Sequence, residues 1–404
     1  MKSKNSQKPI EGVHVFVKGK AVHVISDKSG GFQLPNYTRN PLVLLTHVAF
    51  DSLVIRFSEL KNSSILKMSP RTYSLPAVSI SEQKLEEVFH SRYHYVFDYE
   101  FLEDKIVLLT FNRSLKKDAE ITVCDANQQI LFERGIGAEP EKFIKDYKGN
   151  LYLQTSKAIF VLSLAGDSVE MKKIDKKEYA FRLNHCVDSV SNHVLFNDFK
   201  SYIPRMNYYA LNTIDSNYFL LKSHVNDVVN KMYRWEYYEL SLEQKREARE
   251  MAEKIPNMDK KDVGAMFTGF HKSIYYEPVY APLFVKNDTV LVFDHSSELI
   301  FKFNQFQVID SVSIRYAKNE AKAKWKNKLI MDESEEEFYG LYLKSGYYVL
   351  KNIDVNSGNP TFSYRIEKRF AEKLKIDNGY VYYLYKQPSS QEKPFLYREL
   401  IAGN

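Results

Sequence analysis

The sequence contains few of the residues that mark specialised protein classes. Its 404 residues include only 2 cysteines and 15 glycines, and charged residues of both signs make up 27%. Cys124 and Cys186 are too few for a disulfide framework, and neither stands in the Cys/His spacing of a zinc site. No apolar run reaches the roughly 18 residues of a transmembrane helix. We therefore expect a globular protein of two or three domains without a membrane-spanning segment.

Short motifs with a known mechanism are missing as well. The sequence has no phosphate-binding P-loop, no dinucleotide-binding glycine motif, no HExxH, no GxSxG and no EF-hand loop. It therefore predicts no catalytic residue, no cofactor and no metal. The formal net charge of +6 comes from the first 80 residues, which contain no Lys/Arg-rich helix, so we expect no nucleic-acid partner.

Aromatic residues are abundant, with 29 Tyr and 26 Phe. Because aromatic side chains fit the pleated, half-buried surface of a sheet, we expect a mainly β fold. In the first domain, residues 1–82, Val13, Val15 and Val17 recur with the period of a strand. A turn at 27–31 and short apolar segments at 32–34, 42–49, 53–57 and 65–68 complete the pattern of a small antiparallel β-sandwich.

The first domain also carries a family pattern. It consists of Pro9-Ile10-x-Gly12-Val13-x-Val15, Ser26-Asp27-x-x-Gly30-x-Phe32-x-Leu34, Leu66 and Leu75-x-x-Val78-Ser79-Ile80. In order and spacing these residues resemble the carboxypeptidase-regulatory-like β-sandwich of Bacteroidota envelope proteins. Ala49 stands where the family usually has glycine, and the usual opening strand is missing before Pro9. We therefore expect the sequence to begin inside the domain.

The resemblance implies an exported protein, located in the periplasm or at the outer membrane. Met1 to Lys8 has lysines but no apolar stretch of a signal peptide, so we expect that a signal has been removed. In Bacteroidota the resembling sandwich often accompanies outer-membrane uptake or assembly machines. The resemblance therefore implies a protein partner in the envelope, such as an outer-membrane β-barrel complex.

Residues 83–404 show a repeat in which a polar turn precedes an apolar strand. The turns are marked by Asp104, Gly149, Asn192, Asp288, Glu337 and Asn378. Neighbouring markers are 41 to 49 residues apart, except for one interval of 96 residues. Since a propeller blade of four strands has about 40 to 50 residues, the spacing predicts a six-bladed β-propeller closed by pairing its two ends. A large β-sandwich or barrel is the alternative.

The long interval predicts an α-helical insertion at about 226–276, between blades three and four. Val228, Met232 and Trp235 recur on one helical face, and Ser241 with Gln244 forms a capping-box pattern before a charged helix to about Glu253. We expect this helix to project from the propeller rim. Insertions between repeats often lie on the binding face.

Acidic residues suggest two metal hypotheses. Asp98, Asp146 and Asp188 precede the first three marker turns, and carboxylates from different blades hold a metal in propeller hydrolases of the lactonase type. Their unequal distances from the markers favour ordinary turn capping. The acidic run at 332–337 lacks the glycine and alternation of a calcium loop, so a solvated loop is the better interpretation.

A histidine beside a cysteine suggests a nucleophile and its base. His185 and Cys186 are neighbours, however, and neighbouring side chains of a strand point to opposite faces, so we expect no thiol catalysis. His193 has the pattern of an ordinary strand histidine.

The insertion contains the candidate partner-binding surface. It comprises Met232, Trp235, Tyr237, Tyr238, Met266, Phe267 and Phe270. Tyr and Trp combine a large apolar area with a polar group, as binding surfaces require. The alternative interpretation is that these aromatic residues, with Tyr233 and the tyrosines at 275, 276 and 280, attach the insertion to the propeller.

Together these features favour a non-catalytic binding or scaffold protein of the bacterial cell envelope, an accessory subunit of an outer-membrane uptake or assembly complex. Both predicted modules present loops on a rigid β scaffold, and the sequence offers no activated nucleophile. One alternative is a propeller hydrolase or lyase acting on a glycan, lactone or peptide. Another is a carbohydrate-binding or sensor module, for which a glycan would be the partner.

Overall fold

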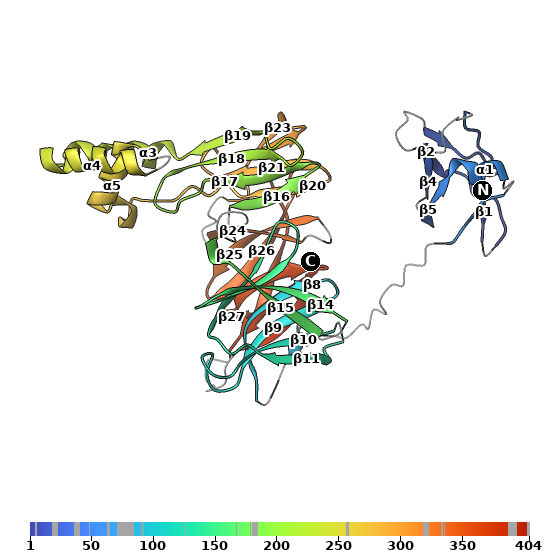
Figure 1. Ribbon diagram of the computed structural model, residues 1–404, viewed down its shortest axis with the longest axis horizontal. Helices are drawn as coiled ribbons and strands as arrows, with labels where there is room; N and C mark the ends of the chain where they lie inside the picture. The colour runs from blue at the N-terminus through green and yellow to red at the C-terminus, as the bar shows by residue number, and fades with distance from the viewer. Residues whose placement is uncertain are drawn as a thin grey trace. The chain divides into compact units, whose positions relative to one another are not determined.

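The computed structural model describes residues 1–4, 6–17, 23–35, 41–47, 49–62, 65–70, 85–89, 91, 93–125, 127–166, 168–177, 179, 185–255, 258–317, 323–332, 334, 336–386 and 394–401. The chain forms two compact units, Met1–Glu82 and Gln83–Asn404 (Figure 1). Strands dominate both units. None of the helices in these ranges is both long and apolar enough to cross a bilayer.

Within its described residues, the first unit contains one four-stranded antiparallel sheet and one short parallel strand pair. Its elements are β1 (Lys2–Ser3), β2 (His14–Val17), β3 (His23–Ile25), β4 (Leu42–His47), β5 (Phe50–Arg56), α1 (Phe57–Asn62) and β6 (Lys67–Met68). The sheet order is β3-β2-β4-β5, and β1 pairs with β6. Val15, Val17 and Leu45 of the sheet are buried in the core, as the alternation of β2 predicts.

The turn at 27–31 forms because the Asp27 carboxylate accepts hydrogen bonds from the backbone N–H groups of Ser29 and Gly31 at 2.8 and 2.9 Å. Gly30 has a φ of 74°, which favours glycine. Two expected strands differ from the structure: residues 32–34 pack on the core without pairing, and the chain becomes helical at Phe57. Leu75 and 78–80 lie outside the described residues.

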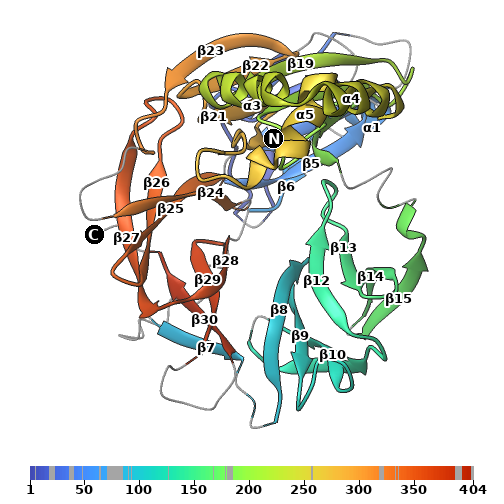
Figure 2. The same cartoon turned by 90° about the vertical axis from the view of Figure 1, so that its left-hand side faces the viewer.

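The second unit is a six-bladed β-propeller, built within the described residues from six four-stranded antiparallel sheets (Figure 2). Blade 1 contains β8 (Tyr95–Leu102), β9 (Lys105–Phe111), β10 (Ala119–Cys124) and β11 (Ile130–Gly135); blade 2 contains β12 (Pro140–Lys145), β13 (Leu151–Thr155), β14 (Ile159–Ala165) and β15 (Ser168–Ile174). Blade 3 contains β16 (Cys186–Val190), β17 (His193–Asn197), β18 (Arg205–Asn212) and β19 (Tyr218–Val225).

The remaining three blades follow the same order. Blade 4 contains β20 (Leu283–Lys286), β21 (Thr289–Asp294), β22 (Leu299–Asn304) and β23 (Gln307–Ser313); blade 5 contains β24 (Lys324–Asp332), β25 (Glu337–Lys344), β26 (Tyr347–Ile353) and β27 (Pro360–Arg369). Blade 6 contains β28 (Glu372–Asp377), β29 (Tyr380–Tyr385), β30 (Phe395–Leu400) and β7 (Leu85–Phe89). The first strand of each blade is the innermost one.

The ring is closed by strand β7, which comes from the start of the unit and forms the outer edge of the last blade. Leu396 of β30 lies opposite Phe89, and Arg398 opposite Glu86. The guanidinium of Arg398 also pairs with the Glu86 carboxylate at 2.6 Å. Closure therefore joins the two ends of the propeller by backbone pairing, which removes an exposed sheet edge.

Five of the six sequence markers lie in the turn between the first and second strands of a blade, and the sixth, Glu337, begins the second strand β25 directly after that turn. Residues in these turns have positive φ, among them Glu103, Gly149, Ser191, Glu336 and Asn378. Tight hairpin turns need such backbone angles, and polar residues or glycine adopt them most readily. The second strands are apolar on both faces because each blade packs between two neighbours; β9, for example, is buried from 106 to 110.

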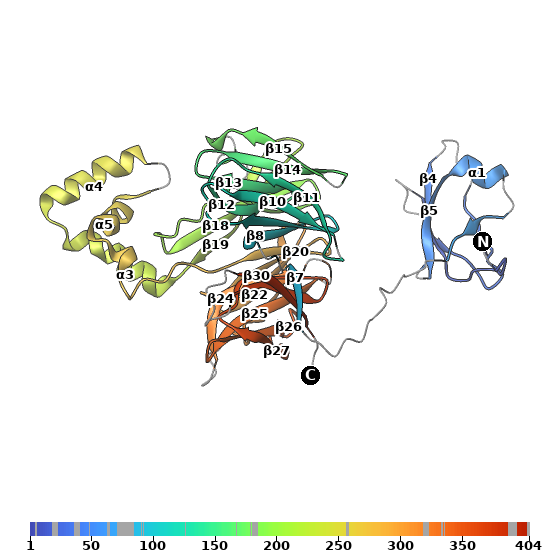
Figure 3. The same cartoon turned by 90° about the horizontal axis from the view of Figure 1, so that it is seen from below.

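The insertion contains helices α3 (Asp227–Glu239), α4 (Leu242–Lys254) and α5 (Lys260–Thr268), followed by the short 3-10 helix at Phe270–Lys272. Figure 3 shows it standing out from one side of the propeller. Ser241 caps α4 in the expected capping box with Gln244. On α3, Val229, Tyr233 and Tyr237 are buried, whereas the predicted face with Val228, Met232 and Trp235 is exposed.

Candidate active site in the propeller channel

Irregular strand pairing shapes the inner wall of the propeller. The innermost strands of blades 1, 2, 3, 5 and 6 each contain a register shift against the next strand. In β24 the shift lies between Trp325 and Leu329, with Asn327 at a φ of 47°; in β28 it lies between Glu372 and Lys375. A β-bulge re-aims the side chains that follow it. These bulges therefore determine which polar residues face the channel.

Four blades line one cavity of about 280 Å³ in this channel. Blade 1 contributes Glu100, blade 2 Lys145, blade 5 Lys328, and blade 6 both Lys375 and Asp377. A second hollow of about 610 Å³ is also lined by Lys145 and Asp377, and it opens at the marker turns of the same blades. The cavity therefore has a mouth on the face that carries these turns.

Charged groups of opposite sign meet in the cavity. The Lys375 ammonium contacts the Glu100 carboxylate and donates a hydrogen bond to the Tyr99 carbonyl oxygen at 2.7 Å. Lys328 also lines the cavity, and although the residue as a whole is exposed, desolvation by the surrounding protein, together with the charge of Lys375, lowers the pKa of its amine. With Lys145, three lysines share the cavity. The site is suited to an anion.

Asp377 stands where the cavity meets its mouth. Burial raises the pKa of its carboxyl, and the charge of Asp332 raises it further, while a hydrogen bond from Asn378 at 2.8 Å and the charge of Lys145 act in the opposite direction. A carboxylate with a raised pKa is a stronger base, and an ammonium with a lowered pKa is a stronger acid. Asp377 and Lys328 therefore form a candidate base and acid.

The three aspartates of the first metal hypothesis have other partners. Asp146 caps its turn, accepting bonds from the backbone N–H groups of Lys148 and Asn150 at 2.8 and 2.9 Å. Asp98 and Asp188 instead bind the next blade. Asp98 accepts from the backbone of Phe143 at 2.9 Å, and Asp188 accepts from that of Val285 at 3.0 Å. These two residues fasten the inner strands together.

The acidic run at 332–337 is not simply a solvated loop. Asp332 is fully buried and accepts a hydrogen bond from the backbone N–H of Gly379 at 2.7 Å, a further link between blades. Glu337 accepts bonds from Tyr339 and Asn352 at 2.7 and 2.9 Å. Residues 333 and 335 lie outside the described residues.

The thiols are poor nucleophiles. Burial raises the pKa of Cys124 to about 12 and also raises the pKa of Cys186, so both are protonated at neutral pH. They lie on blades 1 and 3. His193, whose ring lies 4.4 Å from that of Phe306, packs within an aromatic cluster at the strand.

The seven residues of the candidate partner-binding surface fall into three groups. Met232, Trp235 and Tyr238 on α3 are 38%, 64% and 51% exposed. Met266 and Phe267 are half-buried against the core of the insertion, and Tyr237 and Phe270 are buried. Only the first group is available to a partner. The other aromatic residues hold the three helices together, and Tyr276 fastens them to the propeller by donating to the Ser201 carbonyl at 2.9 Å.

No family model matches the chain, and no curated protein matches it. Among solved structures, the chain is similar to streptogramin B lyase, with 10% identity, a TM-score of 0.32, and coverage of 74% of this chain and 79% of that one. A prolyl endopeptidase has 8% identity and a TM-score of 0.33, over 96% of this chain and 50% of that one. The calcium-binding protein regucalcin from Agrobacterium tumefaciens has 7% identity and a TM-score of 0.35, over 78% and 92%.

These findings correct the main functional expectation. A non-catalytic scaffold was expected, whereas the similar structures include a lyase and an endopeptidase. The expectation that the protein is not an enzyme is likewise unsupported. At 10% identity or less the likeness transfers no activity. Any activity must therefore follow from the chain's own residues.

Proposed function

We propose that this protein is a propeller lyase or hydrolase that binds an anionic substrate in the channel cavity. The observation that carries the proposal is the convergence of Lys145, Lys328, Lys375 and Asp377, from three different blades, on one cavity. Three lysines against the carboxylates of Glu100 and Asp377 leave an excess of positive charge in the cavity, which favours a negatively charged ligand there. A glycan, lactone or peptide that carries a carboxylate is a ligand with this negative charge.

The cavity supplies the groups that acid–base chemistry needs. Lys145 and Lys375 would neutralise the substrate carboxylate. Asp377, as a carboxylate, would take a proton from the carbon beside that group in a lyase, or from water in a hydrolase. In the lyase case the C–H electron pair forms the new double bond and the C–O bond breaks. Lys328 would give its proton to the leaving oxygen.

Removing the Asp377 carboxylate or the Lys328 amine should lower activity by about 100-fold or more, the usual contribution of a general acid or base. The variants are Asp377→Asn and Lys328→Met, assayed on polygalacturonate, carboxylate-bearing lactones and acidic peptides. Unsaturated products indicate elimination. New reducing ends without unsaturation, new amines or acid released from the lactone indicate hydrolysis. The matched control is Asp310→Asn on the outer strand β23, whose partner is Lys302 at 3.1 Å.

The pH profile gives a second readout. Activity should fall as the pH drops through the raised pKa of Asp377, because the base becomes protonated, and fall again as the pH rises through the lowered pKa of Lys328. Each variant should lose one limb of this profile. Equal activity of Asp377→Asn and Asp310→Asn on every substrate that the wild type converts, or no conversion of any of these classes, would overturn the proposal.

We further propose that the first unit is a carboxypeptidase-regulatory-like sandwich and that the protein is exported to the cell envelope. There it would contact a protein partner through Met232, Trp235 and Tyr238 on α3 of the second unit. Support comes from the family pattern in the sequence and from the exposure of these three side chains. Fractionation of the source cells should find the protein in the periplasm or at the outer membrane. Crosslinking in those cells should capture an envelope protein, and less of it with Trp235→Ala. A cytoplasmic location contradicts the proposal.

A further inference from the structure

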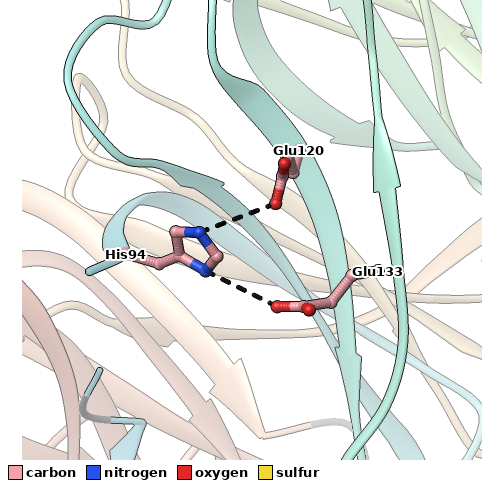
Figure 4. A group of neighbouring side chains, drawn as sticks. All are labelled: His94, Glu120 and Glu133. Carbon is pink, nitrogen blue, oxygen red and sulfur yellow. Dashed lines mark ion pairs between the residues drawn. The ribbon is translucent and has the colours of Figure 1, made fainter. Parts of the chain in front are cut away.

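A second cluster of titratable groups lies on blade 1, outside the channel cavity. His94, just before β8, stands between Glu120 of β10 and Glu133 of β11 (Figure 4). Its ring nitrogens lie 3.9 Å from the Glu120 carboxylate and 3.5 Å from that of Glu133. One ligand atom from each residue falls within 4.8 Å of the others, and within the described ranges no other group of His, Cys, Asp and Glu does so.

The strand register explains why these side chains meet. Glu133 lies opposite Thr122, two residues beyond Glu120 on the same strand, so both carboxylates point to one face of the blade. Thr110, opposite Glu120, joins Thr122 on that face in a buried hydroxyl pair at 2.9 Å. The two glutamates are therefore held on neighbouring strands by regular pairing.

The surroundings leave room for an additional ligand. Gly135 lies opposite Glu120, and the position where its side chain would begin has no atom within 4 Å. The side chains of His94, Glu120 and Glu133 are 25%, 33% and 40% exposed. Solvent thus reaches the cluster from one side, where a water molecule could complete a coordination shell.

The geometry points to a zinc site formed by His94, Glu120 and Glu133. One imidazole nitrogen and two carboxylate oxygens are a donor set that Zn²⁺ accepts, with water in the fourth position. Nε2 of His94 faces Glu120 and Nδ1 faces Glu133, so the ring or one of the partly exposed carboxylates must turn for all three ligands to meet one ion. The ion would link β10 and β11 to the segment that enters β8, and so strengthen blade 1 beside the seam where the ring closes.

The site is tested with the full chain, freed of metal by a chelator and titrated with Zn²⁺ in a calorimeter. The wild type should bind one ion per chain, and Glu133→Gln should weaken its affinity by about tenfold or more, as should His94→Gln. Zn²⁺ at about 100 times its dissociation constant should raise the melting temperature of the wild type by about 4 °C. The matched control is Glu139→Gln, a glutamate of similar exposure that pairs with Lys116 at 3.7 Å.

The competing explanation is a protonated imidazole that bridges the two carboxylates. In that case Glu120→Gln and Glu133→Gln lower the melting temperature alike, and Zn²⁺ has no effect on any variant. That result overturns the proposal. So does equal Zn²⁺ affinity of Glu133→Gln and Glu139→Gln, because the ion would then bind elsewhere. Both results are independent of activity in the channel, so the zinc site and the proposed enzyme can fail separately.

Discussion

A chain that ends before Phe370 should lose the entire propeller fold, and not only its last blade. The truncation removes β28, β29 and β30, so β7 has no strand to pair with and the ring stays open. It also uncovers the faces of blades 1 and 5 that pack on blade 6, including Tyr99, Leu108, Leu350 and Ile366, all fully buried. Each such side chain contributes about 1.5 to 3 kcal/mol by its burial.

The sum of these losses exceeds the stability of the domain. Folded domains are stable by only about 5 to 15 kcal/mol, and the truncation exposes two large apolar faces at once. Circular dichroism and scanning calorimetry of the second unit should therefore show no native β signal and no cooperative transition. A chain ending at Ile401 serves as the control. Native β structure with a cooperative melt in the shorter chain would refute the closed ring.

Replacing Asp262 by alanine should release the insertion from the propeller. Asp262 on α5 is fully buried, and its two carboxylate oxygens accept hydrogen bonds from the Arg205 guanidinium at 2.8 and 2.6 Å. Arg205 begins β18, so this pair joins the insertion to blade 3. The Asp262 carboxylate also accepts from the backbone N–H of Asp259 at the start of α5.

Breaking a buried ion pair on one side costs about 3 to 5 kcal/mol, because the other charge remains without its partner. The lost stability should affect the insertion alone, because its apolar core is separate from the apolar contacts between the blades. We expect faster proteolysis between α3 and α5 and an unchanged melt of the blades. The control is Glu250→Ala on the exposed face of α4, where an i,i+4 pair with Arg246 contributes little. Equal cleavage rates in the two variants would contradict this role.

The repeat could be predicted because its signal is local. A tight turn with positive φ requires particular residues, and a strand packed between two blades must be apolar on both faces. Both requirements act within a few residues, so Gly149 and Asn378 mark their turns in any context. The insertion was visible for the same reason, since Ser241 and Gln244 form their capping box within one helical turn.

The channel site could not be predicted in this way. Lys328 and Lys375 stand in strands with alternating lysines, a pattern that is also typical of a solvated face. Two bulges re-aim these side chains, and a bulge depends on pairing with the next strand. Asp377 has no neighbour in sequence that indicates its raised pKa; the cause is burial and the charge of Asp332 on another blade.

The sequence by itself determined the number of blades and the place of the insertion, because each depends on turns and caps that form locally. The tertiary structure decided which residues meet. Helix α3 has two adjacent apolar stripes, and the one containing Tyr237 is buried against α5 at Gly264. Only glycine permits this approach, because a Cβ atom at position 264 would lie just 3.0 Å from Cα of Tyr237. The stripe with Trp235 is therefore left exposed. Neither the helix contact nor the gathering of lysines in the channel is encoded in any local pattern, since both depend on residues far apart in the chain.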